Sequence, residues 1–375
     1  MKQIIFLTLF CLSILFTPAS VEAVKPKAFS SQEEAECYLT THYNLACEHY
    51  NDQAWRRASN EFEKVIYFFP CSDEASRAYY YLGICYFYMN EYDFANLAFT
   101  NYLKGSEHPE FFEDAVNYKF CIAESFRLGK KKRLFTMRYC PRIESAQTLA
   151  LTIYDEVIIA LPYCDLTAQA LYSKAELLKQ KREYREAIET YQTLIRRFPK
   201  HEIAPACYLG IQDAYCQQSR FEFQNPDLIA LTEINARRFR EEFPRDERVA
   251  IADDLVLCIK ENYAKGLCDI GLLFERKGQP EAAAIYFQSA IEEFPNTRVA
   301  QHCRCRLRSL GYEIQEDEVP TTSVLTQFPQ TNEPPTGSTD AQNPLGPELP
   351  TGPEAIRDKD QGVPIISGSL SNGTN

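Results

Sequence analysis

A recurring phrase, in which an apolar residue is followed by proline, limits the folds open to this chain of 375 residues. The phrase occurs at Phe69-Pro70, His108-Pro109 (a polar variant), Leu161-Pro162, Phe198-Pro199, Phe243-Pro244 and Phe294-Pro295. An amphipathic helical pattern precedes each proline. Because proline lacks an N–H group and its ring clashes with the preceding turn, each one is expected to end a helix. Intervals of 37 to 53 residues between the prolines predict an array of helical repeats.

The helices before these prolines share a register of small and apolar residues. Counting back from Pro70, Pro199 and Pro295 gives Val65, Phe62 and Ala58, then Leu194, Tyr191 and Ala187, then Ala290, Phe287 and Ala283. Before Pro162 only the second helix fits, and the stretch before Pro244 fits poorly. Small residues let two antiparallel helices approach closely, and aromatic residues fill the gaps beside them.

The stretch Leu82-Gly83-x-x-Tyr86, followed by Ala95 and Phe99, fits both helices of the tetratricopeptide consensus. We therefore predict an all-α fold, a tetratricopeptide-like α-solenoid. About five helix pairs over residues 30–312 would form a right-handed superhelix.

Composition divides the chain into three parts. Residues 1–23 are predicted to be a secretory signal peptide, with an apolar run at 4–16 and a Val-x-Ala cleavage site. Lipidation at Cys11 is the less favoured alternative, because Leu9-Phe10 precedes it where lipoprotein signals have a small residue. The repeat domain occupies 24–315. Residues 316–375 hold 9 of the 21 prolines and 6 of the 14 glycines, which predicts a disordered tail.

The net charge of −12 disfavours attraction of the whole chain to nucleic acid. One local exception is the segment 127–142, which has seven basic residues and no acidic one. It includes Lys130, Lys131, Lys132 and Arg133. Such a block can dock on an acidic partner or on lipid head groups, but a solvated loop without a partner is the more frequent explanation.

Thirteen cysteines follow Cys11, and export would place them where disulfides persist. Cys37 and Cys47 are ten residues apart, as are Cys258 and Cys268, which is about 15 Å on one helix and too far for a bridge. Any disulfide would therefore join neighbouring helices or neighbouring molecules. Buried thiols that act as small core residues are the other interpretation.

Motifs that carry chemistry are missing from the sequence. It contains no H-E-x-x-H, G-x-S-x-G or P-loop, and acidic pairs such as Asp253-Asp254 fit the solvated faces of helices. Cys303 and Cys305 would point their thiols about 200° apart on a helix, which argues against a shared metal. We predict a non-catalytic protein with no cofactor and no metal site.

The helical register suggests a groove for an extended peptide. In this repeat class the first helix of each pair lines the concave face, and large aromatic side chains offer contact area at low entropic cost. The predicted groove residues are Tyr43, Tyr50, Tyr80, Ile84, Phe87 and Tyr88. The alternative is that about half of these tyrosines fill the core between repeats.

The sequence also resembles the BamD/ComL family of outer-membrane β-barrel assembly proteins, from about residue 46 to residue 310. The resemblance rests on Ala54-Trp55-Arg56-Arg57-Ala58 with Phe62, on the long insertion before Ala146-x-x-x-Ala150, and on the closing segment 263–278 that continues to Phe294-Pro295. It implies a periplasmic scaffold at the inner face of the outer membrane, with peripheral association to that membrane. Such a scaffold would receive unfolded β-barrel precursors and dock on the barrel-forming insertase.

Carried onto this chain, the family's organisation places the precursor groove among the aromatic residues named above. It places the docking surface in the last repeats, with Arg276 and Arg304. A periplasmic adaptor that coordinates cell-wall synthesis is the alternative. That class begins with a trimeric coiled coil, and residues 24–45 are too short for the three or four heptads it requires.

Overall fold

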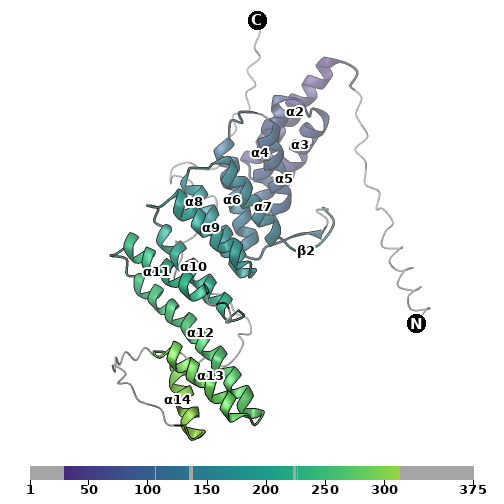
Figure 1. Cartoon of the computed structure of the whole chain (residues 1–375). Coiled ribbons are helices and arrows are strands. Elements are labelled where there is room, and N and C mark those ends of the chain that lie inside the picture. The colour runs from purple at the N-terminus through teal and green to yellow at the C-terminus, as the bar shows by residue number, and fades with distance from the viewer. Residues whose placement is uncertain (1–28, 106, 135–137, 223–224, 226, 313–375) are drawn as a thin grey trace, which may run out of the picture. The chain divides into compact units, whose positions relative to one another are not determined.

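The computed structural model describes residues 29–105, 107–134, 138–222, 225 and 227–312. The predicted signal peptide with Cys11 and the predicted tail at 316–375 lie outside these residues. The described chain contains thirteen helices and one β-hairpin, which confirms the predicted all-α repeat fold (Figure 1). No helix within the described ranges combines the length and the apolar character needed to cross a membrane.

The helices belong to two compact units, and the boundary falls between Ala115 and Val116 within helix α6. The predicted repeat domain at 24–315 thus contains two units. The helices of both units form six consecutive pairs, α2/α3 to α12/α13, followed by α14. This is one pair more than the proline spacing predicts.

Unit 1 consists of α2 (Gln32–Asn51), α3 (Trp55–Phe68), α4 (Asp73–Tyr88), α5 (Tyr92–Gly105) and the first residues of α6 (Phe112–Arg127). Helix α3 packs on both α2 and α4, and α4 packs on α5. Ser31 and Ser72 accept hydrogen bonds from backbone N–H groups and cap the amino-terminal ends of α2 and α4. The register residues Ala58, Phe62 and Val65 are fully buried.

Unit 2 begins with the rest of α6, followed by α7 (Gln147–Ala160), α8 (Asp165–Gln180) and α9 (Tyr184–Arg197). Between α6 and α7, strand β1 (Lys131–Arg133) pairs antiparallel with β2 (Arg142–Ser145). The sequence predicted a basic insertion here, but not a hairpin. Strands of three and four residues are too short to show a periodicity that distinguishes them from a loop.

The remaining helices of unit 2 are α10 (Ala204–Ser219), α11 (Asp227–Glu242), α12 (Val249–Arg276), α13 (Pro280–Glu293) and α14 (Arg298–Ser309). Helix α12 has 28 residues and packs against α10 and α11 as well as against α13 and α14. The pair α10/α11 is the one whose sequence fits the register poorly. It is nevertheless well packed, with Phe239 fully buried and stacked on Tyr208 at a ring distance of 5.4 Å.

The recurring prolines end helices as predicted except at His108-Pro109, which lies in the segment between α5 and α6. Helices α3, α9 and α13 end at the residue directly before the phrase. Phe69, Phe198 and Phe294 form their C-caps with nearly identical backbone angles. Leu161 does the same for α7. Each cap residue donates its N–H group to a carbonyl four residues earlier, and the proline that follows cannot continue this pattern.

Candidate functional site

The structure places the predicted groove residues of unit 1 mainly in the core. Tyr43, Tyr50, Tyr80, Ile84 and Phe87 are all buried, and Tyr50 and Ile84 have no exposed surface. Only Tyr88 is partly exposed. These residues therefore fill the space between helices and do not form the wall of an open groove, which corrects the sequence-based assignment.

Aromatic packing is the physical reason for this burial. Tyr50 packs edge-on against Tyr81 with ring centres 5.2 Å apart, and Tyr80 stacks on Phe111 at 4.5 Å. Tyr88 stacks on Trp55 at 4.7 Å with a ring angle of 11°. Aromatic rings that pack on one another in this way stabilise the unit and leave little ring surface for contact with a ligand.

A depression in unit 1 lies close to these aromatic residues. It encloses about 340 Å³ between the α3–α4 turn, the end of α5 and the segment before α6. Its lining is polar and includes Asp73, Arg77, His108 and Glu110. Arg77 lies 4.0 Å from Glu110, an exposed ion pair that contributes little to stability.

The basic segment of unit 2 forms the hairpin and its flanks. Lys130 and Lys131 are exposed, whereas Lys132 and Arg133 are half-buried. Lys132 Nζ lies 2.9 Å from Glu144 on the facing strand, and Arg133 donates a 2.8 Å hydrogen bond to the carbonyl of Cys140. Four of the predicted docking residues therefore lie together at the hairpin. Two of them, Lys132 and Arg133, interact with other residues of this segment.

The other two predicted docking residues belong to different helices. Arg276 is exposed at the end of α12, and Arg304 is half-buried on α14. The neighbouring Arg306 and Glu275 form the ion pair that links these two helices. Arg276 and Arg304 therefore flank an internal contact and are separate from the hairpin.

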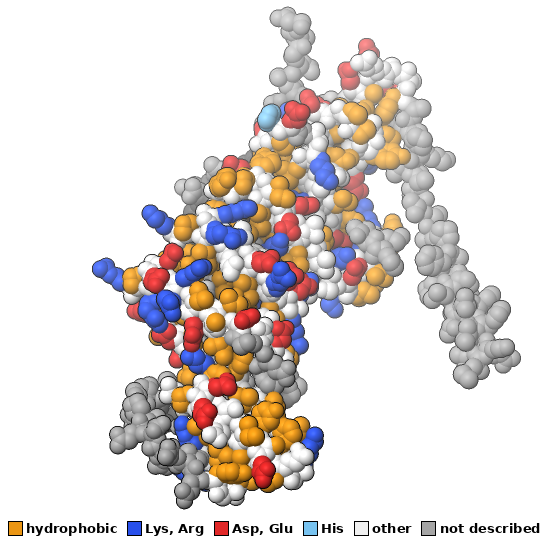
Figure 2. All heavy atoms as spheres, viewed as in Figure 1, with side chains coloured by type: hydrophobic (Ala, Val, Ile, Leu, Met, Phe, Trp, Pro, Cys, Tyr) orange, Lys and Arg blue, Asp and Glu red, His pale blue; other side chains and the backbone are white. Residues whose placement is uncertain are grey.

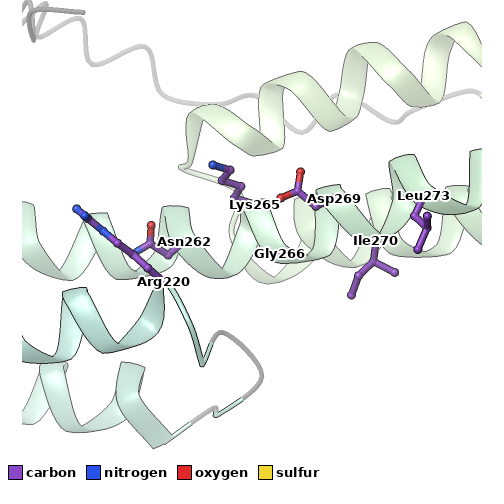
Figure 3. A pocket seen from close by; sticks show the side chains of 7 residues that line it. All are labelled: Arg220, Asn262, Lys265, Gly266, Asp269, Ile270 and Leu273. Atoms are coloured by element: carbon purple, nitrogen blue, oxygen red, sulfur yellow. The ribbon is translucent and has the colours of Figure 1, made fainter. Parts of the chain in front are cut away.

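A cavity in unit 2 was not predicted from the sequence. It has a volume of about 690 Å³ and is lined by Arg220 at the end of α10 and by one stretch of α12: Asn262, Lys265, Gly266, Asp269, Ile270 and Leu273 (Figure 3). Lys265 and Asp269 lie one turn apart, so opposite charges stand next to each other at its edge. Ile270 is half-buried and Leu273 is 46% exposed, and they add apolar surface.

The lining of this cavity combines polar, charged and apolar groups. It offers hydrogen-bond donors, both signs of charge and an apolar contact along about three turns of one helix. A weak sequence signal for it is the closing segment 263–278, which contains most of the lining residues on α12. Exposed charged residues on a helix look alike in sequence whether or not they border a cavity.

Buried carboxylates elsewhere in unit 2 serve the fold. Glu124 accepts a 2.5 Å hydrogen bond from the Tyr154 hydroxyl and a 2.7 Å bond from Arg127. Glu176 accepts hydrogen bonds from Tyr191 and from Lys179, and Lys179 also lies 2.9 Å from Asp213. Burial and the adjacent carboxylates hold the pKa values of Tyr154 and Tyr191 well above their usual range, so both phenols stay protonated donors.

No group of three or more His, Cys, Asp or Glu residues within the described ranges is arranged to hold a metal ion. Charged side chains of both signs are interspersed over the surface in view (Figure 2), which is the pattern of solvated helix faces.

Comparison with family models places a tetratricopeptide repeat at residues 169–201 and at 269–297. The first match covers most of α8 and all of α9, and the second covers the end of α12, all of α13 and the turn after it. The chain contains tetratricopeptide repeats at these two places. A search among curated proteins gave no match.

Solved structures with similar helical arrangements have low sequence identity to this repeat protein. A tetratricopeptide repeat protein from Parabacteroides merdae is 14% identical, with a TM-score of 0.32 over 74% of this chain and 100% of that one. PilF of Pseudomonas aeruginosa is 12% identical, with a TM-score of 0.28 over 72% and 98%. The Rap conjugation regulator of plasmid pLS20, solved with the Phr* peptide, is 13% identical, with a TM-score of 0.26 over 79% and 84%.

Proposed function

We propose that this repeat protein is a non-catalytic scaffold of outer-membrane β-barrel assembly, which binds unfolded barrel precursors and docks on the insertase. The proposed location is the periplasm, at the inner face of the outer membrane. The tetratricopeptide repeats support the general role, since stacked helix pairs present surfaces suited to binding other chains. The resemblance to the BamD/ComL family and the predicted signal peptide support the specific one.

The cavity along α12 is the observation that carries the proposal. The strands of a membrane barrel alternate apolar and polar side chains, so an unfolded strand presents both kinds along one extended segment. In the proposed complex, the apolar side chains of such a segment contact Ile270 and Leu273. Its polar side chains contact the charged residues Arg220, Lys265 and Asp269. The basic hairpin, with Lys130 and Lys131 exposed, is the proposed contact for an acidic surface of the insertase.

Fluorescence anisotropy with the purified full chain tests the binding step. The probe is a labelled synthetic peptide with the alternating pattern of a barrel strand, and a peptide of the same composition in scrambled order is the comparison. We expect the alternating peptide to bind more tightly. Leu273→Asp should raise its dissociation constant by about tenfold, which corresponds to the loss of about 1.4 kcal/mol of binding free energy.

Leu97→Asp is the matched control, because Leu97 is similarly exposed at 51% but lies on α5 in unit 1. Equal binding of both peptides, or equal effects of the two substitutions, contradicts the proposed site. A photoreactive residue at position 273 then tests the partner in envelopes. Cross-linking to barrel precursors supports assembly, and cross-linking to cell-wall synthases favours the adaptor function instead.

A further inference from the structure

Two cysteines on neighbouring helices of unit 2 hold their thiols together. Cys216 lies on α10 and is almost fully buried, whereas Cys258 lies on α12 and is half-buried. Helix α10 packs on α12, and the proximity of the two thiols raises the pKa of Cys216 and lowers the pKa of Cys258. Both residues belong to one core cluster, and Asn262 Nδ2 lies 3.9 Å from Cys216 Sγ. Their side chains therefore already meet across the helix interface.

A second pair repeats this arrangement further along α12. Cys268 and Cys303, from α12 and α14, are buried in a separate core cluster. Helix α12 also packs on α14, and the proximity of these two thiols raises the pKa of Cys303 and lowers the pKa of Cys268. Cys258 and Cys268 are too far apart along one helix to bond to each other, so each has its partner on a different neighbouring helix.

We propose that these thiols form two disulfides, Cys216–Cys258 and Cys268–Cys303, which tie α12 to α10 and to α14. Helix α12 is the longest in the described chain, and its two halves pack on different helices. The bridges would fix both halves. They would also hold the cavity in place, because Arg220 follows directly after α10 and the other lining residues lie on α12.

The chemistry requires an oxidant, which we identify by class as a disulfide-containing molecule. The Cys258 thiolate attacks one of its sulfur atoms, forms a mixed disulfide and releases one thiol. Cys216 then loses its proton, attacks the sulfur of Cys258 and releases the second thiol. Two cysteine thiols are thereby oxidised to one disulfide, and the oxidant's disulfide is reduced to two thiols.

The surroundings of Cys258 suit the first step. The neighbouring Cys216 thiol and the positive charge of Arg220 lower the pKa of the Cys258 thiol. Both favour the thiolate, and Cys258 is the more exposed of the two sulfur-bearing residues. Cys268 and Cys303 are both buried, so their bridge is expected to form while the chain folds and not in the native protein.

Peptide mapping of the full chain tests both bridges. Reduced protein is exposed to oxidised glutathione, either native or during refolding, and is then unfolded in acid, alkylated and digested with trypsin without reduction. We expect a link between peptides 201–220 and 249–260 under both conditions, and a link between 266–276 and 299–304 after refolding. Oxidation should raise the melting temperature by about 5–10 °C.

Cys207→Ser and Cys305→Ser are the matched controls. Cys207 shares a tryptic peptide with Cys216, and Cys305 follows Cys303 by two residues but is exposed. Both links must persist in these variants. Their persistence identifies Cys216 and Cys303 as the bridged residues, and this result does not require that Cys216→Ser folds. Complete alkylation of the four cysteines after refolding with the oxidant, or links to other cysteines, would overturn the proposal.

Discussion

Gly83 on α4 lies directly against the ring of Phe99 on α5. A Cβ atom on Gly83 would be 2.7 Å from Phe99 Cε1, closer than side chains pack. The same relationship recurs between Gly271 and Phe287, where the distance would be 2.6 Å. The glycine thus lets two helices of a repeat approach, and the aromatic ring fills the space above it.

Gly83→Ala should lower the stability of the protein. The added methyl group forces the buried Phe99 ring to shift, at a cost of about 1–3 kcal/mol, which exceeds the gain of up to about 1 kcal/mol in helix propensity. Thermal unfolding followed by circular dichroism measures the change. Gly105→Ala is the control, because no atom lies within 4 Å of the added carbon, and its melting temperature should stay the same or rise.

Much of this packing could be predicted from the sequence, because proline stops and the small-aromatic register are local signals. Ala58, Phe62 and Val65 are buried as the register requires. The periodicity shows which residues face a neighbour, but not whether that neighbour is protein or solvent. The register alone therefore favours a groove position for Tyr80, although the ring of Phe111 stacks on it.

The cavity along α12 could not be predicted for a related reason. Arg220 joins Lys265 and Asp269 only because α10 ends beside α12, a contact between residues more than forty positions apart in sequence. The cysteine pairs could not be predicted from the sequence for the same reason. Helix geometry excluded pairs within one helix, but only the packing of α12 shows which partner each thiol meets.

Tyr154→Phe should destabilise unit 2 by about 1–3 kcal/mol. The change removes the hydroxyl group that donates a hydrogen bond to Glu124. The buried carboxylate then loses this bond and retains the hydrogen bond from Arg127. Denaturant unfolding gives the free energy. Tyr163→Phe provides the comparison, because Tyr163 is 86% exposed and should tolerate the loss of its hydroxyl. Equal stability of the two variants would show that the Glu124 contact contributes nothing.

Asp246 should make stability depend on pH in the acidic range. Hydrogen bonds from the Arg248 side chain lower the pKa of this carboxyl group in the folded protein. Its stabilising effect is therefore complete above the unfolded value of about 3.9 and is lost as the pH falls through the lower folded value. Asp246→Asn should reduce the melting temperature at pH 7, and the difference from the parent protein should vanish near about pH 2.

Asp254→Asn is the control for this titration. Asp254 is exposed on α12, so its substitution should change the melting temperature little at any pH. A difference between Asp246→Asn and the parent protein that persists unchanged to about pH 2 would mean that the carboxylate charge does not stabilise the fold.

In the reduced protein, Cys258 should react with iodoacetamide at a lower pH than Cys305. The neighbouring Cys216 thiol and the Arg220 guanidinium lower the pKa of the Cys258 thiol, so its thiolate is present at a pH where an ordinary exposed thiol is still protonated. Mass spectrometry of peptides 249–260 and 305–306 gives both alkylation rates in one sample. Arg220→Gln removes the positive charge and should shift the Cys258 profile to higher pH, while the Cys305 profile stays in place. Identical profiles for the two cysteines in the parent protein would show that Arg220 and Cys216 do not stabilise the thiolate.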